Sequence, residues 1–390
     1  MQVSEYVRFD AVGLAELVAA GEVTADELQE VAHRALEAVN PQLNAVVESW
    51  EADAAPPPGS TPLAGVPFLV KDIGVLLAGR RSELGSRLAA GHVADADSAL
   101  ARRLRRAGLV VFGRTATPEL AYSTTTEPVL YGATRNPWDL TRRAGGSSGG
   151  AGAAVAAGVG PIAHGTDAAG SIRIPAAYNG LFGLKPTRGR ISVGPQFDEV
   201  FNGLAVQGCV SRTVRDSAAL LDLVSGPEPG DPYVAPEPVR PYAREVGRPP
   251  GALRIGVVAQ PWGGHRTSPP VAAALARTVH LLESRGPPGG GGAGGPGGGP
   301  PGGGGAPGPR WGPAARAPGA RPGRATEAHR GDRDRRDVPR RTVGPRRPRG
   351  RGARRRGRVG CGGRAERRAA DEPRGMRQQG RVVRAGQASA

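Results

Sequence analysis

Apolar and polar positions along most of the chain are spaced as in helices and short strands. Asp10 stands in the N-cap position of a first helical pattern near the N-terminus. Thr24 and Glu27 have the spacing of a capping box, in which side chains and backbone satisfy each other's hydrogen bonds at the first turn. The pattern that follows predicts a second helix that reaches Asn40-Pro41.

Further along, predicted helices alternate with short apolar runs. Residues 98–107 form an amphipathic helical pattern, and an apolar run at 109–112 follows it. A run of small apolar residues at 151–160 is compatible with a helix, and residues 161–167 resemble a short buried strand. The alternation returns within 253–286 as LRIGVV and then VAAALARTVHLLESRG, a predicted strand and helix. Helices that alternate with short apolar strands predict an α/β sheet protein.

The composition of the chain changes at about residue 285. From there to residue 390 the sequence contains no Leu, Ile, Phe or Tyr, and it holds 26 Arg against 7 acidic residues. This stretch therefore carries a charge of +19, so that −2 of the formal net charge of +17 is left for residues 1–284. A segment with so few large apolar side chains cannot bury enough surface to offset the entropy lost on ordering. We therefore predict a folded domain at 1–284 and a disordered low-complexity tail at 285–390.

Two explanations of the tail stay open. Clustered Arg side chains supply phosphate contacts, so the tail could be a nucleic-acid-binding arm. Single-strand binders interleave stacking aromatic residues, however, and the tail offers only Trp311, so a nucleic-acid partner is the less favoured explanation. Gly, Pro, Arg and Ala are the residues of GC-rich codons, and a shift of reading frame in a GC-rich gene would produce this mixture. The frame shift is favoured because the last apolar helical pattern stops abruptly where the composition changes.

Three residues in glycine-rich segments carry the candidate chemistry. Lys71 lies in PLAGVPFLVKDIG, Ser147 in GGSSGG and Ser171 in GTDAAGSIRIPAA. Only two of the 52 basic residues are lysine, and a buried ammonium group, unlike a guanidinium group, can lose its proton. A serine hydroxyl becomes a good nucleophile only when a base removes its proton, and a neutral lysine can be that base. The pattern predicts a serine hydrolase that uses lysine in place of histidine.

On composition alone, GGSSGG matches a flexible linker. Together with the serine of GTDAAGS, 24 residues after Ser147, and with GLKPTRGRIS, it resembles the amidase signature family over residues 12–258. The segments TTEP, GATRNPW and VRDSAALLD are similar to one branch, the bacterial amidases like 6-aminohexanoate-cyclic-dimer hydrolase. The resemblance implies an amidase-signature fold, with a mixed twisted sheet covered by helices. It implies Ser171 as nucleophile, Ser147 after a cis Gly146–Ser147 bond as bridging serine, and Lys71 as terminal base.

The resemblance also places an oxyanion hole before the nucleophile, at Ala168, Ala169 and Gly170. Backbone N–H groups that converge there would stabilise the oxyanion of a tetrahedral intermediate. Many family members have Gly at the position of Ala169, and the methyl group of this chain would trim the pocket. Taken in isolation, the same run of small residues is equally compatible with a tight turn.

Four further residues near these motifs are expected to be structural. Asp167 and Arg173 bracket the nucleophile, and we expect an ion pair that holds the turn, with binding of a substrate carboxylate by Arg173 as the alternative. His164 lies in a predicted strand and is expected to be structural, not a catalytic base. Lys185 in GLKPT resembles a scaffold position of the family, so we leave it out of the catalytic set.

The resemblance implies a hydrolase that cleaves C–N bonds of linear or cyclic small-molecule amides through a serine acyl-enzyme, without metal or cofactor. The A subunit of an aminoacyl-tRNA amidotransferase is the alternative within the family, and the TTEP and DAAGS variants lean away from it. Family members continue beyond the change in composition, so the amidase signature domain at 1–284 is expected to be incomplete and the chain to have little activity. The oligomeric state is left open, with a homodimer among the options.

The location of the protein is predicted from signals that the sequence does not contain. The N-terminal residues show no basic-then-apolar signal segment, and no run of 18 or more apolar residues occurs. Cys209 and Cys361 are too few for a disulfide framework. We therefore expect a cytoplasmic protein without a membrane segment.

Overall fold

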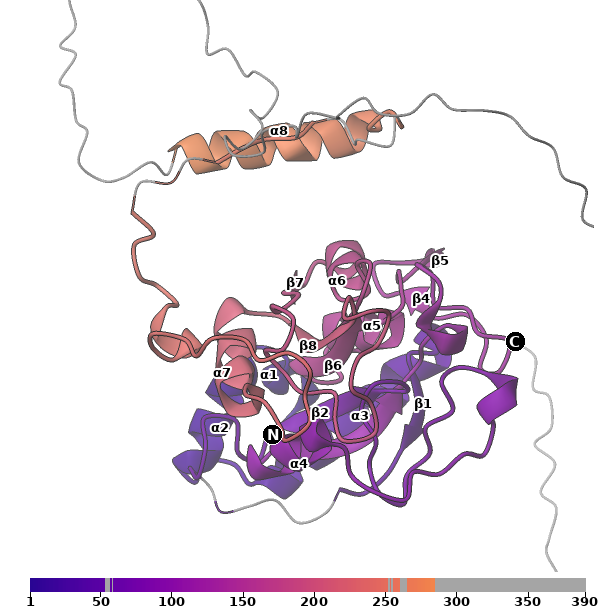
Figure 1. The fold of residues 1–390 in the computed structure, drawn as a ribbon. Helices are drawn as coiled ribbons and strands as arrows, with labels where there is room; N and C mark the ends of the chain where they lie inside the picture. Colours follow the sequence, from indigo (N-terminus) through magenta and orange to yellow (C-terminus); the bar gives the residue numbers. More distant parts are fainter. Residues whose placement is uncertain (53–56, 58, 252, 254, 260–264, 285–390) are drawn as a thin grey trace, which may run out of the picture. The chain divides into compact units, whose positions relative to one another are not determined.

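The computed structural model describes residues 1–52, 57, 59–251, 253, 255–259 and 265–284. Within these residues the main sheet has six strands in the spatial order β1, β3, β2, β6, β8, β7 (Figure 1). Their bounds are β1 Val46–Ser49, β2 Pro67–Lys71, β3 Val110–Thr115, β6 Ile162–Asp167, β7 Phe182–Gly183 and β8 Val206–Ser211. Strand β2 is parallel to β3 and β6, whereas β1 is antiparallel to β3 and β8 is antiparallel to β6 and β7. The sheet is mixed, and the predicted α/β class is confirmed.

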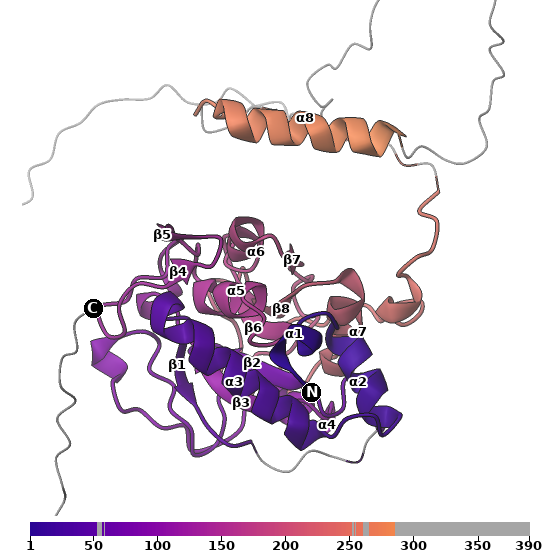
Figure 2. The same ribbon diagram turned by 180° about the vertical axis from the view of Figure 1, so that it is seen from behind.

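The helices of the described part are α1 Val3–Tyr6, α2 Ala11–Ala19, α3 Ala25–Leu43, α4 Ala99–Arg106, α5 Gly149–Ala156, α6 Arg173–Asn179, α7 Val214–Val224 and α8 Pro269–Ser284. Helix α8 has no buried residue. Helices α3 and α5 contact each other and both pack against β2 and β3, so they cover the same face, the one turned to the viewer in Figure 2. Helix α7 packs against β8 and contacts α2 and α4. Strands β4 Arg135–Asn136 and β5 Asp139–Arg143 form a separate hairpin, and short 3₁₀ turns occur at Arg87–Ala89, Glu119–Ala121 and Tyr242–Arg244.

The two predicted N-caps are confirmed. Asp10 Oδ1 accepts a hydrogen bond from the Gly13 N–H at 3.0 Å and so caps α2. At the start of α3, Thr24 Oγ1 accepts from the Glu27 N–H at 3.1 Å, and the Glu27 carboxylate accepts from the Thr24 N–H at 2.8 Å. These bonds satisfy backbone donors that have no partner inside the helix.

Helix α3 continues beyond its predicted end at Asn40-Pro41 and stops at Leu43. Proline has no N–H to donate, but the loss of one bond is tolerated so near the end of a helix. Asn40 Oδ1 accepts a hydrogen bond from the Val46 N–H at 2.9 Å, and Asn44 adopts the left-handed conformation that ends the helix. The stabilising contacts come from the chain that follows the helix, which is why the helical pattern alone placed the end too early.

The predicted helix within 253–286 is confirmed as α8, whereas the predicted strand before it was wrong. Residues 253 and 255–259 form no strand, and Ile255 and Val258 are 49% and 53% exposed. A strand needs a neighbour for its backbone N–H and C=O groups. No strand in the described part pairs with this segment, so its apolar residues do not enter the sheet.

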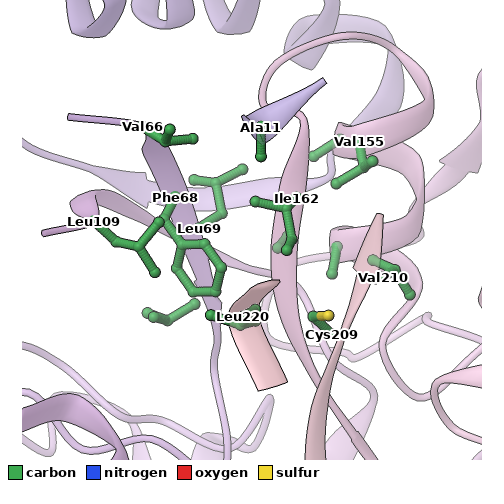
Figure 3. Packing of buried hydrophobic residues seen from close by; sticks show 14 of the residues in the cluster. Ala11, Val66, Phe68, Leu69, Leu109, Val155, Ile162, Cys209, Val210 and Leu220 are labelled. Carbon is green, nitrogen blue, oxygen red and sulfur yellow. The ribbon is translucent and has the colours of Figure 1, made fainter. Parts of the chain in front are cut away.

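Buried apolar side chains of the strands and of the helices packed on them form a core cluster (Figure 3). Phe68 and Leu69 of β2, Ile162 of β6 and Val210 of β8 are fully buried, and Leu220 of α7 packs into the same cluster. Burial of such side chains is worth about 1.5–3 kcal/mol each. This packing fixes β2 and β6 beside each other, and it thereby fixes the polar residues at their carboxyl ends.

The expectations on membrane segments, cysteines and the tail can be compared with the structure only in part. No helix among the described residues is long and apolar enough to cross a membrane. Cys209 is buried as a free thiol, and Cys361 lies outside the described residues. The tail predicted at 285–390 also lies outside them.

Candidate active site

Lys71 is the last residue of β2, and it is only 1% exposed. Because β2 and β6 are parallel neighbours, their carboxyl ends meet at one edge of the sheet. Lys71 Nζ lies there 2.7 Å from Ser147 Oγ and 2.8 Å from Thr166 Oγ1. The two partners are 76 and 95 residues away in sequence, so only the fold brings them to the lysine.

Ser147 lies in a loop before α5 whose glycines are closely packed. The Gly146–Ser147 peptide bond is cis, as the resemblance implied. A Cβ atom at Gly146 would lie 2.8 Å from the backbone of Thr125, and one at Gly150 would lie 2.4 Å from the backbone of Ala116. Real Cβ atoms do not approach backbone so closely, so the glycines of GGSSGG permit tight packing and do not form a linker.

Ser171 lies in the turn between β6 and α6. Its carbonyl oxygen accepts a hydrogen bond from the Ser148 N–H at 3.2 Å, which ties this turn to the loop of Ser147. Ser147 and Ser171 both line a cavity of about 260 Å³. Among the described residues the Ser171 hydroxyl has no hydrogen-bond partner, so the contact between the two hydroxyls that a proton relay uses is not formed in this structure.

Asp167, the last residue of β6, organises the turn that carries Ser171. Its buried carboxylate accepts hydrogen bonds from the N–H groups of Gly170 and Ile172 at 2.8 and 3.2 Å. The Arg173 guanidinium donates to both carboxylate oxygens at 2.9 Å each, which confirms the predicted ion pair. Burial alone would raise the pKa of Asp167, but the Arg173 guanidinium and the backbone donors hold that pKa below its ordinary value.

The predicted oxyanion segment lies between Asp167 and Ser171. Gly170 has a φ of +118°, a conformation that favours glycine, and its N–H already donates to Asp167. The N–H groups of Ala168 and Ala169 have no protein acceptor among the described residues. Of the three predicted donors, these two are therefore not used by the described protein groups, and Ala168 lines the cavity whereas Ala169 does not.

His164 is buried behind the candidate site and is tied to the backbone. Its Nδ1 accepts a hydrogen bond from the Lys71 N–H at 3.2 Å, so its Nε2 carries the proton and donates to Gln207 Oε1 at 2.8 Å. The Gln207 amide in turn donates to the Gly74 carbonyl at 2.7 Å. Burial lowers the pKa of His164 to about 4, so the imidazole is neutral near pH 7. These contacts agree with the predicted structural role.

The surroundings of Lys71 favour its neutral form. Burial lowers the pKa of the Lys71 amine to about 7, although the carboxylates of Asp167 and Asp72 act in the opposite direction. A substantial fraction of the amine is therefore neutral near pH 7 and can accept a proton. Lys185, in contrast, donates from Nζ to the Pro186 carbonyl at 2.7 Å and lies outside the cavity lining.

Sequence reasoning missed Thr166, Asp72 and Gln207, which surround Lys71 directly or through His164. Thr166 is the threonine of GTDAAGS, and its place in the motif of Ser171 was the signal that could have drawn attention to it. Asp72 was visible beside the lysine, and this adjacency was the one signal that could have drawn attention to it. In the described part, no group of three or more His, Cys, Asp or Glu side chains is arranged to hold a metal ion.

The cavity is mainly apolar. The hydroxyls of Ser147, Thr166 and Ser171 and the Gln207 amide supply its polar groups. No charged side chain of the described part lines it. Its apolar walls include Ile73, Leu76, Leu84, Val193, Phe197 and Phe201. A ligand of this cavity therefore meets apolar surface around a small polar centre.

The low pKa of Lys71 predicts a pH-dependent stability that a Lys71→Met variant would lack. The unfolded chain keeps the lysine proton up to about 10.5, whereas the folded chain loses it near 7. Between these values the unfolded state binds more protons, so the wild type gains stability as the pH rises. At about 1.36 kcal/mol per unit, the gain is of the order of 5 kcal/mol across the window.

Urea unfolding of both proteins at several pH values measures this effect. The free energy of unfolding of Lys71→Met minus that of the wild type is expected to fall steadily as the pH rises from 7 to 10.5. The other titrating groups cancel in this difference. A difference that stays constant would mean that the folded protein holds Lys71 as an ordinary ammonium ion.

Comparison with known proteins supports the assignment of the fold. The profile of the Amidase family matches residues 16–288. The chain is 48% identical over 288 residues to 6-aminohexanoate-cyclic-dimer hydrolase of Paenarthrobacter ureafaciens, a match that covers 71% of this chain and 58% of the relative. The structure of 6-aminohexanoate cyclic dimer hydrolase complexed with substrate matches with a TM-score of 0.68 at 45% identity, over 71% of this chain and 59% of that chain. The structure of a bacterial aryl acylamidase matches with a TM-score of 0.63 at 28% identity, over the same shares of the two chains.

The α/β fold of this chain is that of the amidases that it matches in structure. The chain belongs to the amidase signature family. The predicted family, its fold and the similarity to the cyclic-dimer hydrolase branch are thereby confirmed. The matched region spans somewhat more than half the length of the curated relatives.

Proposed function

We propose that this chain cleaves C–N bonds of linear or cyclic amides through an acyl-enzyme, with Ser171 as nucleophile, Ser147 as bridging serine and Lys71 as terminal base. The observation that carries the proposal is the position of the buried Lys71 amine, 2.7 Å from Ser147 Oγ and beside the cavity that Ser171 lines. The pKa of that amine, about 7, suits a group that must both take and return a proton near neutral pH. Membership in the amidase signature family supports the same chemistry.

Acylation begins when Ser171 Oγ attacks the carbonyl carbon of the amide. The Ser171 proton passes to Ser147 Oγ, while the Ser147 hydroxyl proton passes to the neutral Lys71 amine. The N–H groups of Ala168 and Ala169 stabilise the oxyanion of the tetrahedral intermediate. The C–N bond then breaks, and the leaving nitrogen receives the proton back from Lys71 through Ser147.

Deacylation repeats the same transfers with water. A water molecule attacks the carbonyl carbon of the acyl-enzyme and gives its proton to Lys71 through Ser147. The bond between that carbon and Ser171 Oγ breaks, the acid leaves, and Ser171 regains its proton. The proposal includes no metal and no cofactor.

The substrate in this proposal is a small amide whose acyl part is neutral and largely apolar. Burial of apolar surface in the cavity favours binding by roughly 25 cal/mol per Å². A charged acyl group would lose its hydration without gaining a partner, because no charged side chain of the described part lines the cavity. Similarity to a 6-aminohexanoate-cyclic-dimer hydrolase points in the same direction.

We place the amidase domain at residues 1–284 and expect slow turnover by the chain as it stands. Leu120, Phe197 and Phe201 line the cavity although they are 45%, 51% and 45% exposed. Water that enters past these side chains weakens the electrostatic stabilisation of the reacting groups. The interpretation of residues 285–390 as a frame-shift product lies outside the described residues and stays a prediction.

Two alternatives have their own tests. The amidotransferase alternative would need partner proteins, so release of ammonia from simple primary amides by the isolated chain argues for the hydrolase. The 48% identity to a cyclic-dimer hydrolase agrees with this preference. A nucleic-acid-binding arm at 285–390 would produce a salt-sensitive shift of single-stranded nucleic acid in a gel.

Covalent labelling tests the proposal without requiring full turnover. A fluorophosphonate reacts with an activated serine as the Oγ atom displaces fluoride from phosphorus. We expect the full chain to be labelled at Ser171, with a rate that rises as the pH passes through about 7 and Lys71 loses its proton. Peptide mapping by mass spectrometry locates the label. Labelling of a different serine, or of none at any pH, would contradict the assignment.

A further inference from the structure

Asp72 follows Lys71 directly and is buried, yet it does not line the cavity. Its carboxylate accepts hydrogen bonds from the N–H groups of Glu83 and Gly85 at 2.8 and 2.9 Å. It also forms a short ion pair with Arg114 Nη1. Three donors therefore hold this carboxylate in place beside the candidate base.

Arg114 lies on β3 at the centre of a buried ionic cluster, and its side chain is 3% exposed. Besides Asp72 it binds the carboxylates of Glu83 and Glu48, each at 2.9 Å, and the Tyr131 hydroxyl at 3.0 Å. The Tyr131 hydroxyl in turn donates to Glu83. One guanidinium group thus serves three carboxylates, so loss of Arg114 would leave only negative charge in this part of the core.

Two carboxylates act on the charge of Lys71, and each of them is paired with an arginine. Asp72 pairs with Arg114, and Asp167 pairs with Arg173. A carboxylate near a lysine favours the ammonium form, whereas a guanidinium bound to that carboxylate offsets its charge. The two arginines therefore limit the effect of the two carboxylates on the pKa of Lys71. Burial remains the larger effect on that pKa.

We propose that Arg114 is a positioning residue of the amide-cleaving site, which offsets the charge of Asp72 and so keeps Lys71 from being held as an ammonium ion. Arg114 contacts neither serine and does not line the cavity, so it acts through Asp72. The inference rests on the proposed role of Lys71 as base. The protonation state of the Lys71 amine, however, can be measured without any turnover.

The surroundings of Lys71 leave few other routes for such an effect. Among the described residues, the titratable and charged groups that face it are Asp72 after β2, His164 and Asp167 on β6 and, beyond Asp167, Arg173 on α6. Its remaining partners, Ser147 and Thr166, carry no charge. Of the whole set, Asp72 is the member that Arg114 contacts. A change at Arg114 should therefore reach the lysine through Asp72.

The sequence offers a direct measurement, because Lys71 and Lys185 are the only lysines of the chain. The full-length protein grown with lysine labelled with ¹³C at Cε gives two side-chain signals in an NMR spectrum. A Lys185→Arg variant identifies the signal of Lys71. Its chemical shift followed against pH gives the midpoint of Lys71 deprotonation, whether or not the protein hydrolyses amides.

Arg114→Gln is expected to raise this midpoint by about one pH unit or more, because an unpaired Asp72 then favours the ammonium form. Asp72→Asn is expected to lower the midpoint, because it removes the carboxylate while Arg114 stays paired with Glu48 and Glu83. In the double variant most of the upward shift should be lost, since two residues that act through one contact are not additive.

Arg103→Gln is the matched control. The Arg103 side chain is 8% exposed and pairs with the partly exposed Glu228 at 2.7 Å, so the variant also breaks an ion pair of a buried arginine. Arg103 contacts none of the groups around Lys71 among the described residues. The Lys71 midpoint is expected to stay at its wild-type value. Equal shifts in both arginine variants would reflect a general loosening of the fold and overturn the proposal.

A folded Arg114→Gln protein with an unchanged midpoint would also overturn it. If that variant does not fold, Asp72→Asn decides: a lower midpoint supports the proposal and an unchanged midpoint overturns it. The fluorophosphonate labelling rate gives a second reading of the same change, because its pH profile should move with the NMR midpoint. Failure of labelling together with a shifted midpoint would contradict the proposed function and leave the role of Arg114 supported.

Discussion

A Ser171→Ala variant of the full chain is expected to lose fluorophosphonate labelling completely and to reduce amide hydrolysis to the uncatalysed background. Alanine has no atom that can attack the carbonyl carbon, and neither Ser147 nor Thr166 can replace it, because both hydroxyls are bound to Lys71. In a fully active serine hydrolase, removal of the nucleophile costs on the order of 10⁶-fold in turnover. Because slow turnover is expected of this chain, its measurable loss of hydrolysis is smaller, and loss of labelling is the decisive result. The fold should survive, since the Ser171 hydroxyl has no hydrogen-bond partner among the described residues.

Ser123→Ala is the control for this experiment. Ser123 is exposed, bonds only to Thr125 among the described residues and is absent from the cavity lining. Its removal should change neither labelling nor hydrolysis. Circular dichroism and urea unfolding establish that both variants fold. Labelling that persists in folded Ser171→Ala would remove Ser171 from the mechanism.

A Lys71→Arg variant is expected to lose activity nearly as completely as Lys71→Ala. Arginine keeps the positive charge, but its guanidinium group cannot be deprotonated in a protein and so cannot accept the proton that Ser147 passes on. General-base catalysis contributes about 10²–10⁴-fold, which sets the size of the expected loss in both labelling rate and turnover. Ser147→Ala should be less damaging, because a water molecule can bridge the same two groups.

The second lysine supplies the control. Lys185→Arg makes the same chemical change at a residue that donates to the Pro186 carbonyl and does not line the cavity. Its activity and labelling should match those of the wild type. Substantial activity in Lys71→Arg would show that Lys71 acts through its charge or its packing, and the base would then have to be another residue.

Local patterns in the sequence predicted those parts of the fold whose hydrogen bonds are local. The caps at Asp10 and Thr24 were predicted correctly because a cap and its helix lie within four residues. The strand ending at Asp167 was likewise visible as a short apolar run. The end of α3 was missed because the side chain of Asn40 bonds to the chain after the helix.

The failed strand at 253–258 has a related cause. LRIGVV has the composition of a buried strand. Composition shows that a segment can form a strand, but not whether a partner strand lies beside it. Pairing itself requires an edge strand as a partner, and neither β1 nor β7, the two edge strands of the described sheet, pairs with this segment. The apolar residues Ile255 and Val258 stay about half exposed as a result.

By itself, the sequence determined which residues are candidates for the chemistry. A lysine retained in a chain rich in arginine, and serines in two glycine-rich motifs, identify Lys71, Ser147 and Ser171 because their chemical properties are written in residue type and close neighbours. Only the tertiary structure decided what surrounds them. In the structure Lys71 donates a hydrogen bond to Thr166, and the Gly170 N–H donates to Asp167. Arg114 forms an ion pair with Asp72, the carboxylate that follows the lysine. Those contacts join residues of different strands and loops, and the free energy that selects them comes from burial and charge pairing in three dimensions, which no local pattern records.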